Sequence, residues 1–126
     1  MYIAGPGGRQ QVLYEDVGSE LQAITNMVWV EIHIYPCGIE LPQTHPGFTE
    51  LSYILQGTVV GALANPVTGI IRHGTFTAGN IAPVPDSAFH SAENPSCTEE
   101  IILQQAQSGG VSAPNVLQGP AENIAA

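Results

Sequence analysis

Hydrophobic and polar residues alternate in the first regular stretch of the chain, residues 27–35. Every second position there is β-branched, namely Val28, Val30, Ile32 and Ile34. A period of two is typical of a strand that buries one face. The stretch is therefore predicted to be a strand, and Pro36 and Gly38 mark its end.

Similar short runs follow one another until about residue 107. Pro-Gly, Asn-Pro and Ala-Gly-Asn sequences separate them, and helical periodicity is nearly absent. About eight strands are predicted, at residues 27–35, 39–45, 48–57, 58–64, 69–77, 81–85, 87–94 and 99–107. Short strands at this spacing are typical of a single jelly-roll β-barrel, with an open β-sandwich as the alternative. The predicted fold class is all-β.

The length and the less patterned ends suggest the domain organisation. A chain of 126 residues can bury one core but is too short for two. We expect one domain over residues 1–126, with the barrel core at about 24–107 and short arms at 1–23 and 108–126. The arms are interpreted as edge strands, arms or short helices that cover the barrel ends or reach a partner chain. The expected assembly is a homodimer.

Composition and charge narrow the classes of partner. The chain has two Arg, no Lys and eleven acidic residues, a formal net charge of -9, so nucleic acid and anionic membrane surfaces would be repelled. Its longest apolar stretches, such as 59–64, are far shorter than a membrane span. The N-terminus begins with Met and lacks the pattern of a secretory signal, which favours a cytoplasmic location, or a secreted one if the chain is truncated.

Four polar residues form the candidate site. Gln43 and His45 are two apart, so their side chains point the same way in an extended strand. Glu50 follows a Pro-Gly turn that resets the register, and His90 needs only a strand next to the first one. Two imidazoles and a carboxylate are the ligands of non-haem Fe(II) enzymes and also suit Mn or Zn. We therefore predict a divalent metal at His45, Glu50 and His90.

Gln43 has two open roles in this site. Its amide oxygen could be a fourth ligand, or the side chain could hold water or substrate. The alternative to the metal site is that both histidines are ordinary hydrogen-bonded core residues. Glu50 fits that alternative poorly, because a buried carboxylate is costly unless it is paired or bound to a cation.

The remaining histidines and the cysteines are expected to be structural. His33 alternates with buried positions and His73 lies at a hairpin, so both are predicted at the surface. Cys37 and Cys97 fall at the same end of the barrel if the strands that bear the two site histidines pair antiparallel. A disulfide is then geometrically possible, but we favour two unrelated thiols, as a reducing cytosol would keep them.

Two segments resemble the motifs of germin-like cupins. The run CGIELPQTHPGFTELSYILQG resembles the first motif, G-x5-H-x-H-x(3,4)-E-x6-G, with Cys37, Gln43, His45, Glu50 and Gly57 at its fixed positions. The run GNIAPVPDSAFHSAEN resembles the second motif, G-x5-P-x-G-x2-H-x3-N, with Gly79, Pro85, Ser87, His90 and Asn94 at its positions. The resemblance covers roughly residues 24 to 119 and implies the cupin jelly roll.

Three positions depart from the motifs. Cys37 and Ser87 replace glycines, and Gln43 replaces the first metal-binding histidine. The resemblance implies a Mn shell of three His and one Glu, which is incomplete here. Because a neutral amide differs from an imidazole, the metal preference and redox chemistry of germins do not transfer automatically.

Three functions are consistent with these residues. The first is a metal-dependent enzyme acting on a small oxygenated substrate as a lyase, isomerase or cyclase, or oxygenase, with Gln43, His45, Glu50 and His90 as its catalytic and metal-binding residues. The second is a germin-type Mn oxidoreductase, an oxalate oxidase or superoxide dismutase. The third is a metal-free cupin in which Glu50 or a histidine acts as acid or base, or which only binds a small molecule.

Overall fold

A computed structural model describes residues 2–13, 26–108 and 117–119. The described residues form no helix and eleven strands: β1 (Tyr2–Gly5), β2 (Gly8–Val12), β3 (Met27–Ile34), β4 (Ile39–Gln43), β5 (Glu50–Gln56), β6 (Thr58–Ala64), β7 (Ile71–Thr77), β8 (Ile81–Val84), β9 (Phe89–Glu93), β10 (Ile101–Ser108) and β11 (Leu117–Gln118). Within this part of the chain, no helix could cross a membrane.

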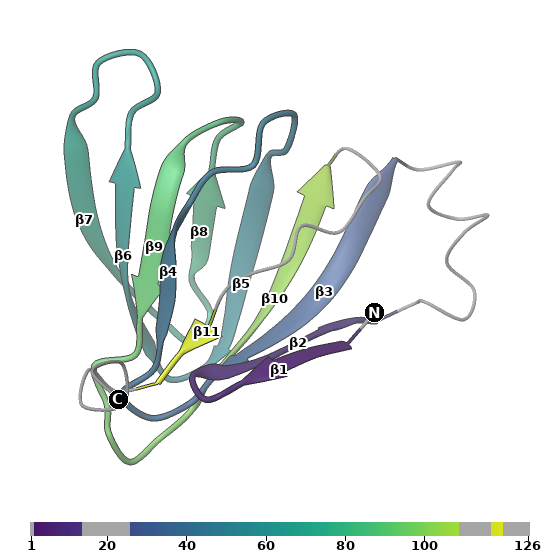
Figure 1. Ribbon diagram of the computed structural model, residues 1–126, viewed down its shortest axis with the longest axis vertical. Helices are drawn as coiled ribbons and strands as arrows, with labels where there is room; N and C mark the ends of the chain where they lie inside the picture. The colour runs from purple at the N-terminus through teal and green to yellow at the C-terminus, as the bar shows by residue number, and fades with distance from the viewer. Residues whose placement is uncertain (1, 14–25, 109–116, 120–126) are drawn as a thin grey trace.

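The strands form two antiparallel sheets that face each other around a common interior (Figure 1). One sheet has six strands in the order β1-β2-β3-β10-β5-β8, and the other has five in the order β11-β4-β9-β6-β7. Neighbours in each sheet include strands far apart in sequence, such as β3 and β10 or β4 and β9. This is a cupin-like jelly roll, so the predicted all-β barrel is confirmed. All eight predicted strands are present, as β3 to β10.

The described parts of the two predicted arms lie in the sheets. Strand β2 pairs with β3, and β1 pairs with β2, so residues 2–12 extend the six-stranded sheet at its edge. Strand β11 pairs with β4 at the edge of the other sheet. These segments are therefore edge strands, one of the three interpretations considered for them. The rest of both arms lies outside the described residues, and the single-domain boundaries stay a prediction.

The core lies between the sheets and follows from the alternation in the sequence. The β-branched residues of β3 are fully buried, and residues of β5, β6 and β10 pack against them. The core residues are Val28, Val30, Ile32, Ile34, Ile54, Val59, Ile101 and Leu103. Burying such a side chain stabilises the fold by about 1.5–3 kcal/mol. This packed layer fixes the strands whose ends bear the polar site.

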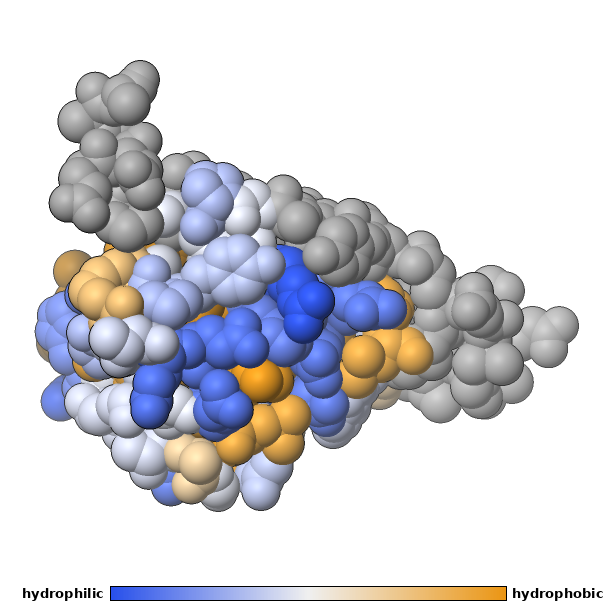
Figure 2. Space-filling view, turned by 90° about the horizontal axis from the view of Figure 1, so that it is seen from below, coloured by the Kyte–Doolittle hydropathy of each residue, from blue (hydrophilic) through white to orange (hydrophobic). Residues whose placement is uncertain are grey.

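The lower end of the barrel is held by a disulfide and by Asn94. The sulfur atoms of Cys37 and Cys97 are bonded, so the preference for two unrelated thiols is wrong. The side-chain amide of Asn94 donates to the carbonyls of Ile34, Tyr35 and Glu99 at 2.8–3.1 Å. Viewed from below in Figure 2, the molecule presents mainly hydrophilic residues with separate apolar patches.

Two motif positions that usually hold glycine keep a glycine-like backbone. Cys37 has φ of 59° and Ser87 has φ of 63°, both in the left-handed region that side chains with a Cβ disfavour. The turns that these positions form are therefore preserved although the residues differ. The departures at Cys37 and Ser87 leave the fold unchanged.

His33 is buried, so its predicted surface position is wrong. The residue is only 6% exposed because polar side chains cover it on the outer face of β3. Its ring nitrogens lie 2.8 Å from Glu31, 3.3 Å from Glu100 and 3.3–3.4 Å from Arg9. The side-chain hydrogen bond to His33 is the largest of the effects that lower the pKa of Glu31. The alternation placed His33 on the right face, but it could not show which residues of other strands would cover it.

Candidate metal centre

The predicted ligands come together at the end of the barrel where β4 ends and β5 and β9 begin (Figure 1). Glu50 is the first residue of β5 and points inward with the alternate residues Ser52 and Ile54. His90 is on β9, directly opposite Gln43 of β4 in the sheet. His45 lies in the loop between β4 and β5. The convergence predicted from sequence is therefore present.

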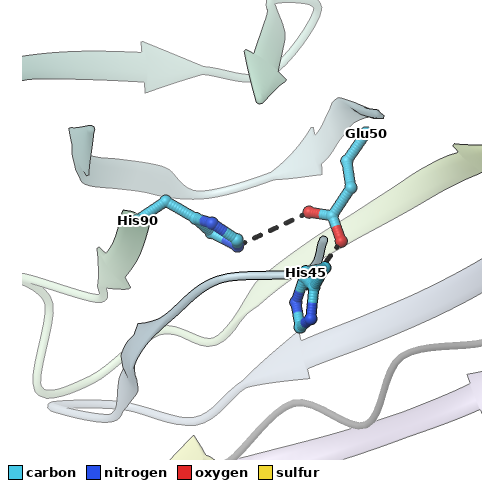
Figure 3. Close-up of side chains that lie close together, drawn as sticks. All are labelled: His45, Glu50 and His90. Atoms are coloured by element: carbon cyan, nitrogen blue, oxygen red, sulfur yellow. Dashed lines mark ion pairs between the residues drawn. The ribbon is translucent and has the colours of Figure 1, made fainter. Parts of the chain in front are cut away.

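Glu50 lies between the two imidazoles (Figure 3). Its Oε1 is 3.6 Å from Nε2 of His45, and its Oε2 is 3.5 Å from Nε2 of His90. One donor atom from each of the three residues lies within 4.8 Å of the other two. The two imidazole rings have centroids 5.3 Å apart and planes at 62°. Three donors thus face one small space from three directions.

Hydrogen bonds between the two loops hold this arrangement. The Thr44 hydroxyl donates to the carbonyl of Ser87 at 2.9 Å, and the Gly47 N–H donates to Asp86 Oδ1 at 2.8 Å. The Ser87 hydroxyl donates to the same Asp86 oxygen at 2.7 Å. The hydrogen bond from Ser87 has the largest effect on the pKa of Asp86. Together with the bond from Gly47, it keeps this pKa below its ordinary value. The loop that bears His45 is therefore tied to the turn that precedes His90.

A hydrogen bond sets the orientation of the His90 ring. Nδ1 lies 3.0 Å from the carbonyl oxygen of Ala88, a geometry that fits a proton on Nδ1 and leaves the lone pair of Nε2 directed at the site. His90 is only 7% exposed. Burial by itself lowers the pKa of His90, but Glu40, the Ala88 carbonyl and Glu50 together raise it above the ordinary value.

Glu40 is a second buried carboxylate that sequence reasoning missed. Its side chain is 2% exposed, and its Oε1 lies 3.5 Å from Nε2 of His90. The amide of Gln43 donates to the same oxygen at 2.5 Å. Gln43 thus shares the site with Glu40, and its role as a metal ligand stays a prediction.

Burial dominates the electrostatics of Glu50. The side chain is 1% exposed, and desolvation raises its pKa to about 7, with Glu40 adding to the rise and His90 opposing it. The nearest described donor at Oε1 is the Gln107 amide at 3.4 Å, and no described residue hydrogen-bonds to Oε2. Since a buried carboxylate needs a partner, this oxygen is suited to a cation.

The residues fit a divalent metal. Two donors bound to one ion at about 2.1 Å lie about 3.0–3.4 Å apart, close to the 3.5 and 3.6 Å found between Glu50 and the imidazoles. Nε2 of His90 likewise has no hydrogen-bond partner among the described residues. The charges of Glu40 and Glu50 would be balanced by a 2+ ion. His45, Glu50 and His90 could therefore hold the metal, with Glu40 beside it.

The apoprotein should become less stable as the pH rises from about 4.5 to about 7. Glu50 has a raised pKa when folded, so its neutral form favours folding below the unfolded value, and this contribution is lost as the pH rises through about 7. The raised pKa of His90 acts in the same direction. For Glu50 the loss is about 3 kcal/mol.

Thermal unfolding of chelator-treated protein between pH 5 and pH 8 measures this effect. The melting temperature should fall toward pH 8, and added divalent metal should restore it because the metal binds the deprotonated ligands. The variant Glu50→Gln is the control, since it should lose most of the dependence. An apoprotein whose melting temperature is unchanged over this range would contradict the electrostatic account of Glu50.

A cavity of about 240 Å³ inside the barrel reaches the site from one side. This volume lies just below the range of about 300–1,000 Å³ typical of small-molecule sites. Its polar inner end includes Glu40, His90, Ser52 and Gln105. The rest of the lining is largely apolar, as in Ile54, Val59, Leu63, Phe76, Val84 and Leu103. A small organic molecule could therefore approach His90 through the barrel.

Solved structures with this fold include those of a bacterial enzyme. Oxalate decarboxylase from Bacillus subtilis at pH 4.6 is 19% identical with a TM-score of 0.77, over 92% of this chain and 29% of that chain. A second structure comes from a study of the Mn(II) centres of the same enzyme. It is 19% identical with a TM-score of 0.76, over 91% of this chain and 29% of that one. The chain thus spans under a third of this enzyme, and the likeness shows the fold alone.

Comparison of the chain with models of protein families identifies its family. No curated protein matches the chain. The family model described as Cupin matches residues 18–119, which include all the predicted ligands. The match agrees with the jelly roll and with the two motifs. The chain belongs to the cupin family.

Proposed function

We propose that the protein is a small-molecule enzyme whose barrel holds a divalent metal on His45, Glu50 and His90. The observation that carries this proposal is the convergence of three largely buried donor residues beside a cavity. The substrate would be a small oxygenated organic molecule, and the reaction of lyase, isomerase or cyclase, or oxygenase type. The metal, when bound, would polarise a carbonyl, carboxylate or enol group, or bind dioxygen.

The protein's own residues would position the substrate. Glu40 and His90 line the inner end of the cavity, so a reacting group placed there lies beside the metal ligands. The apolar walls exclude water from the substrate body, which strengthens polar contacts at the inner end. The Gln43 amide holds the Glu40 carboxylate in place. Gln43 would thereby act through Glu40, or contact substrate or water directly.

The metal would be Mn, Fe or Zn. Two imidazoles and one or two carboxylates bind all three ions, and the carboxylates favour harder ions such as Mn²⁺. The Mn(II) centres of Bacillus subtilis oxalate decarboxylase show that a protein with this fold can use Mn. That observation also supports the second candidate, a germin-type Mn oxidoreductase acting as oxalate oxidase or superoxide dismutase.

Gln43→His separates the two metal-dependent candidates. The change supplies an imidazole at the position where the germin motif has one. If the protein is a germin with a degraded site, the Mn-loaded variant should gain dismutase or oxalate oxidase activity at least about tenfold above the wild type. Our leading proposal expects neither activity in either protein. Gln43→Ala is the control, since it removes the amide without adding a ligand.

The metal-free candidate rests on the raised pKa of Glu50, which suits a general acid or base near neutral pH. In this case the same cavity would bind a small molecule for acid-base chemistry or for binding alone. Metal content separates this candidate from the other two.

The homodimer and the cytoplasmic location of the protein are both proposals. The outer face of the six-stranded sheet exposes Trp29, Leu51, Tyr53 and Ile81, and the register puts them on one side of β3, β5 and β8. An apolar face of this kind supports a homodimer built on that sheet. No observation bears on a nucleic-acid or membrane partner. That the protein binds neither stays a prediction.

A further inference from the structure

The second arginine of the chain lies in the wall of the cavity. Arg72 is on the edge strand β7, where it pairs with Leu63 of β6, and Leu63 pairs in turn with His90 of β9. Directly paired residues of neighbouring strands project to the same face of a sheet. Arg72 therefore shares its face with His90, and it lines the cavity while remaining exposed.

The spacing of the strands sets the distance from Arg72 to the metal site. Two steps between neighbouring strands of about 4.8 Å put the backbones of Arg72 and His90 about 10 Å apart. The apolar side chains Leu63 and Phe76 line the cavity with them. The cavity thus has a cationic end open to solvent, an apolar middle and an inner end with the metal ligand His90.

Arg72 has no acidic partner among the described residues. No carboxylate of the described residues lies within ion-pair distance of its guanidinium, although the chain carries eleven acidic residues. The other arginine, Arg9, lies instead beside His33 on the outer face of the six-stranded sheet. Arg72 is therefore the one permanent cation that faces the cavity.

We propose that Arg72 binds the carboxylate of the substrate, which is a small monocarboxylic acid with an apolar body. This inference rests on the proposed function, because it names the substrate class of the same cavity. The guanidinium fork matches a carboxylate, and a single cation balances a monoanion better than a doubly charged phosphate. The inner end already holds the carboxylate of Glu40, and Glu50 Oε2 lies 3.5 Å from Nε2 of His90, so the charged end of a substrate would lie at Arg72. Its other end would then reach His90.

Binding of matched acids and amides tests the proposal. Hexanoate and phenylacetate are titrated into the protein, together with hexanamide and phenylacetamide, which have the same shape without the charge. Calorimetry or ligand-observed NMR gives the dissociation constants. The wild type should bind each acid at least about tenfold more tightly than its amide, since bonds between two charged groups are the strong ones. Arg72→Gln should abolish the preference, and Arg72→Lys should keep part of it.

Arg9→Gln is the matched control, because it removes the same charge from a place outside the cavity and should leave the preference intact. A wild type without preference for the acids, including one that binds none of the probes, would overturn the proposal. So would an unchanged preference in Arg72→Gln.

Each titration is made with both apoprotein and Zn²⁺-loaded protein. An acid preference at Arg72 in a protein that takes up no metal would contradict the proposed enzyme and leave the carboxylate site standing. Stoichiometric metal binding without any preference for the acids would contradict the carboxylate site and leave the proposed enzyme standing.

Discussion

The variant Glu50→Gln should bind Mn²⁺, Fe²⁺ and Zn²⁺ at least about 100-fold more weakly than the wild type. Replacing even a residue that only supports a ligand typically costs 10–100-fold in metal affinity, and Glu50 would be a ligand itself, the one that lies between both imidazoles. The amide keeps the shape of the side chain but loses its charge. Competition titration of chelator-treated protein measures the affinity for each ion.

A stability measurement separates a functional role of Glu50 from a structural one. At pH 8 the Glu50→Gln apoprotein should be more stable than the wild type, because no charge is then buried at this position. Glu93→Gln removes the same charge at an exposed position of β9. It should alter neither the metal affinity nor the stability of the apoprotein at pH 8. Unchanged metal affinity in Glu50→Gln would contradict its assignment as a ligand.

Reducing the disulfide between Cys37 and Cys97 should lower the free energy of unfolding by about 4 kcal/mol. The bond closes a loop with a sequence separation of 60, and the cost of leaving that loop open in the unfolded chain gives this magnitude. For a domain of this size the melting temperature should fall by more than about 10 °C. Thermal unfolding with and without reductant measures the change.

The variant Cys97→Ser is the control, because reductant should then have no effect. Equal melting temperatures of oxidised and reduced wild type would contradict a stabilising bond. The redox state also bears on location, since a cytoplasmic protein would keep the two thiols reduced and a secreted one would keep the bond. Mass analysis of alkylated protein from its native source distinguishes these two states.

The alternation of hydrophobic and polar residues predicted most of the fold, because a strand with one buried face has a hydrophobic residue at every second position. The strand at 27–35 is an example, since its β-branched positions are the fully buried residues of β3. The convergence of the three candidate metal ligands was also predictable. His45, Glu50 and His90 occupy motif positions whose turns survive even where Cys37 and Ser87 replace glycines.

Glu40 was missed because the strand that bears it is irregular. With a strict period of two, Glu40 and Gln43 would point to opposite faces. The register of β4 against β9 shifts between these two residues, around Pro42, which has no N–H for the sheet. The shift lets both side chains meet inside the barrel. A proline within a predicted strand was the available signal.

His73 was expected at a hairpin surface, and Arg72 is its neighbour in the sequence. They are indeed exposed, but the two residues lie within β7 and also line the cavity. The pairing of β7 with β6, and of β6 with β9, depends on contacts between distant parts of the chain. The sequence of β7 alone holds no information on that partner order, so the relation of Arg72 to His90 was visible only in the folded chain.

The proposed chemistry depends on a divalent metal bound in the cupin barrel by His45, Glu50 and His90. Elemental analysis by inductively coupled plasma mass spectrometry, on protein purified without affinity tag or chelator, measures whether that metal is present. We expect close to one Mn, Fe or Zn per chain in the wild type and loss of that metal in Glu50→Gln. A wild type that contains no metal and takes up none when it is added would contradict this proposal.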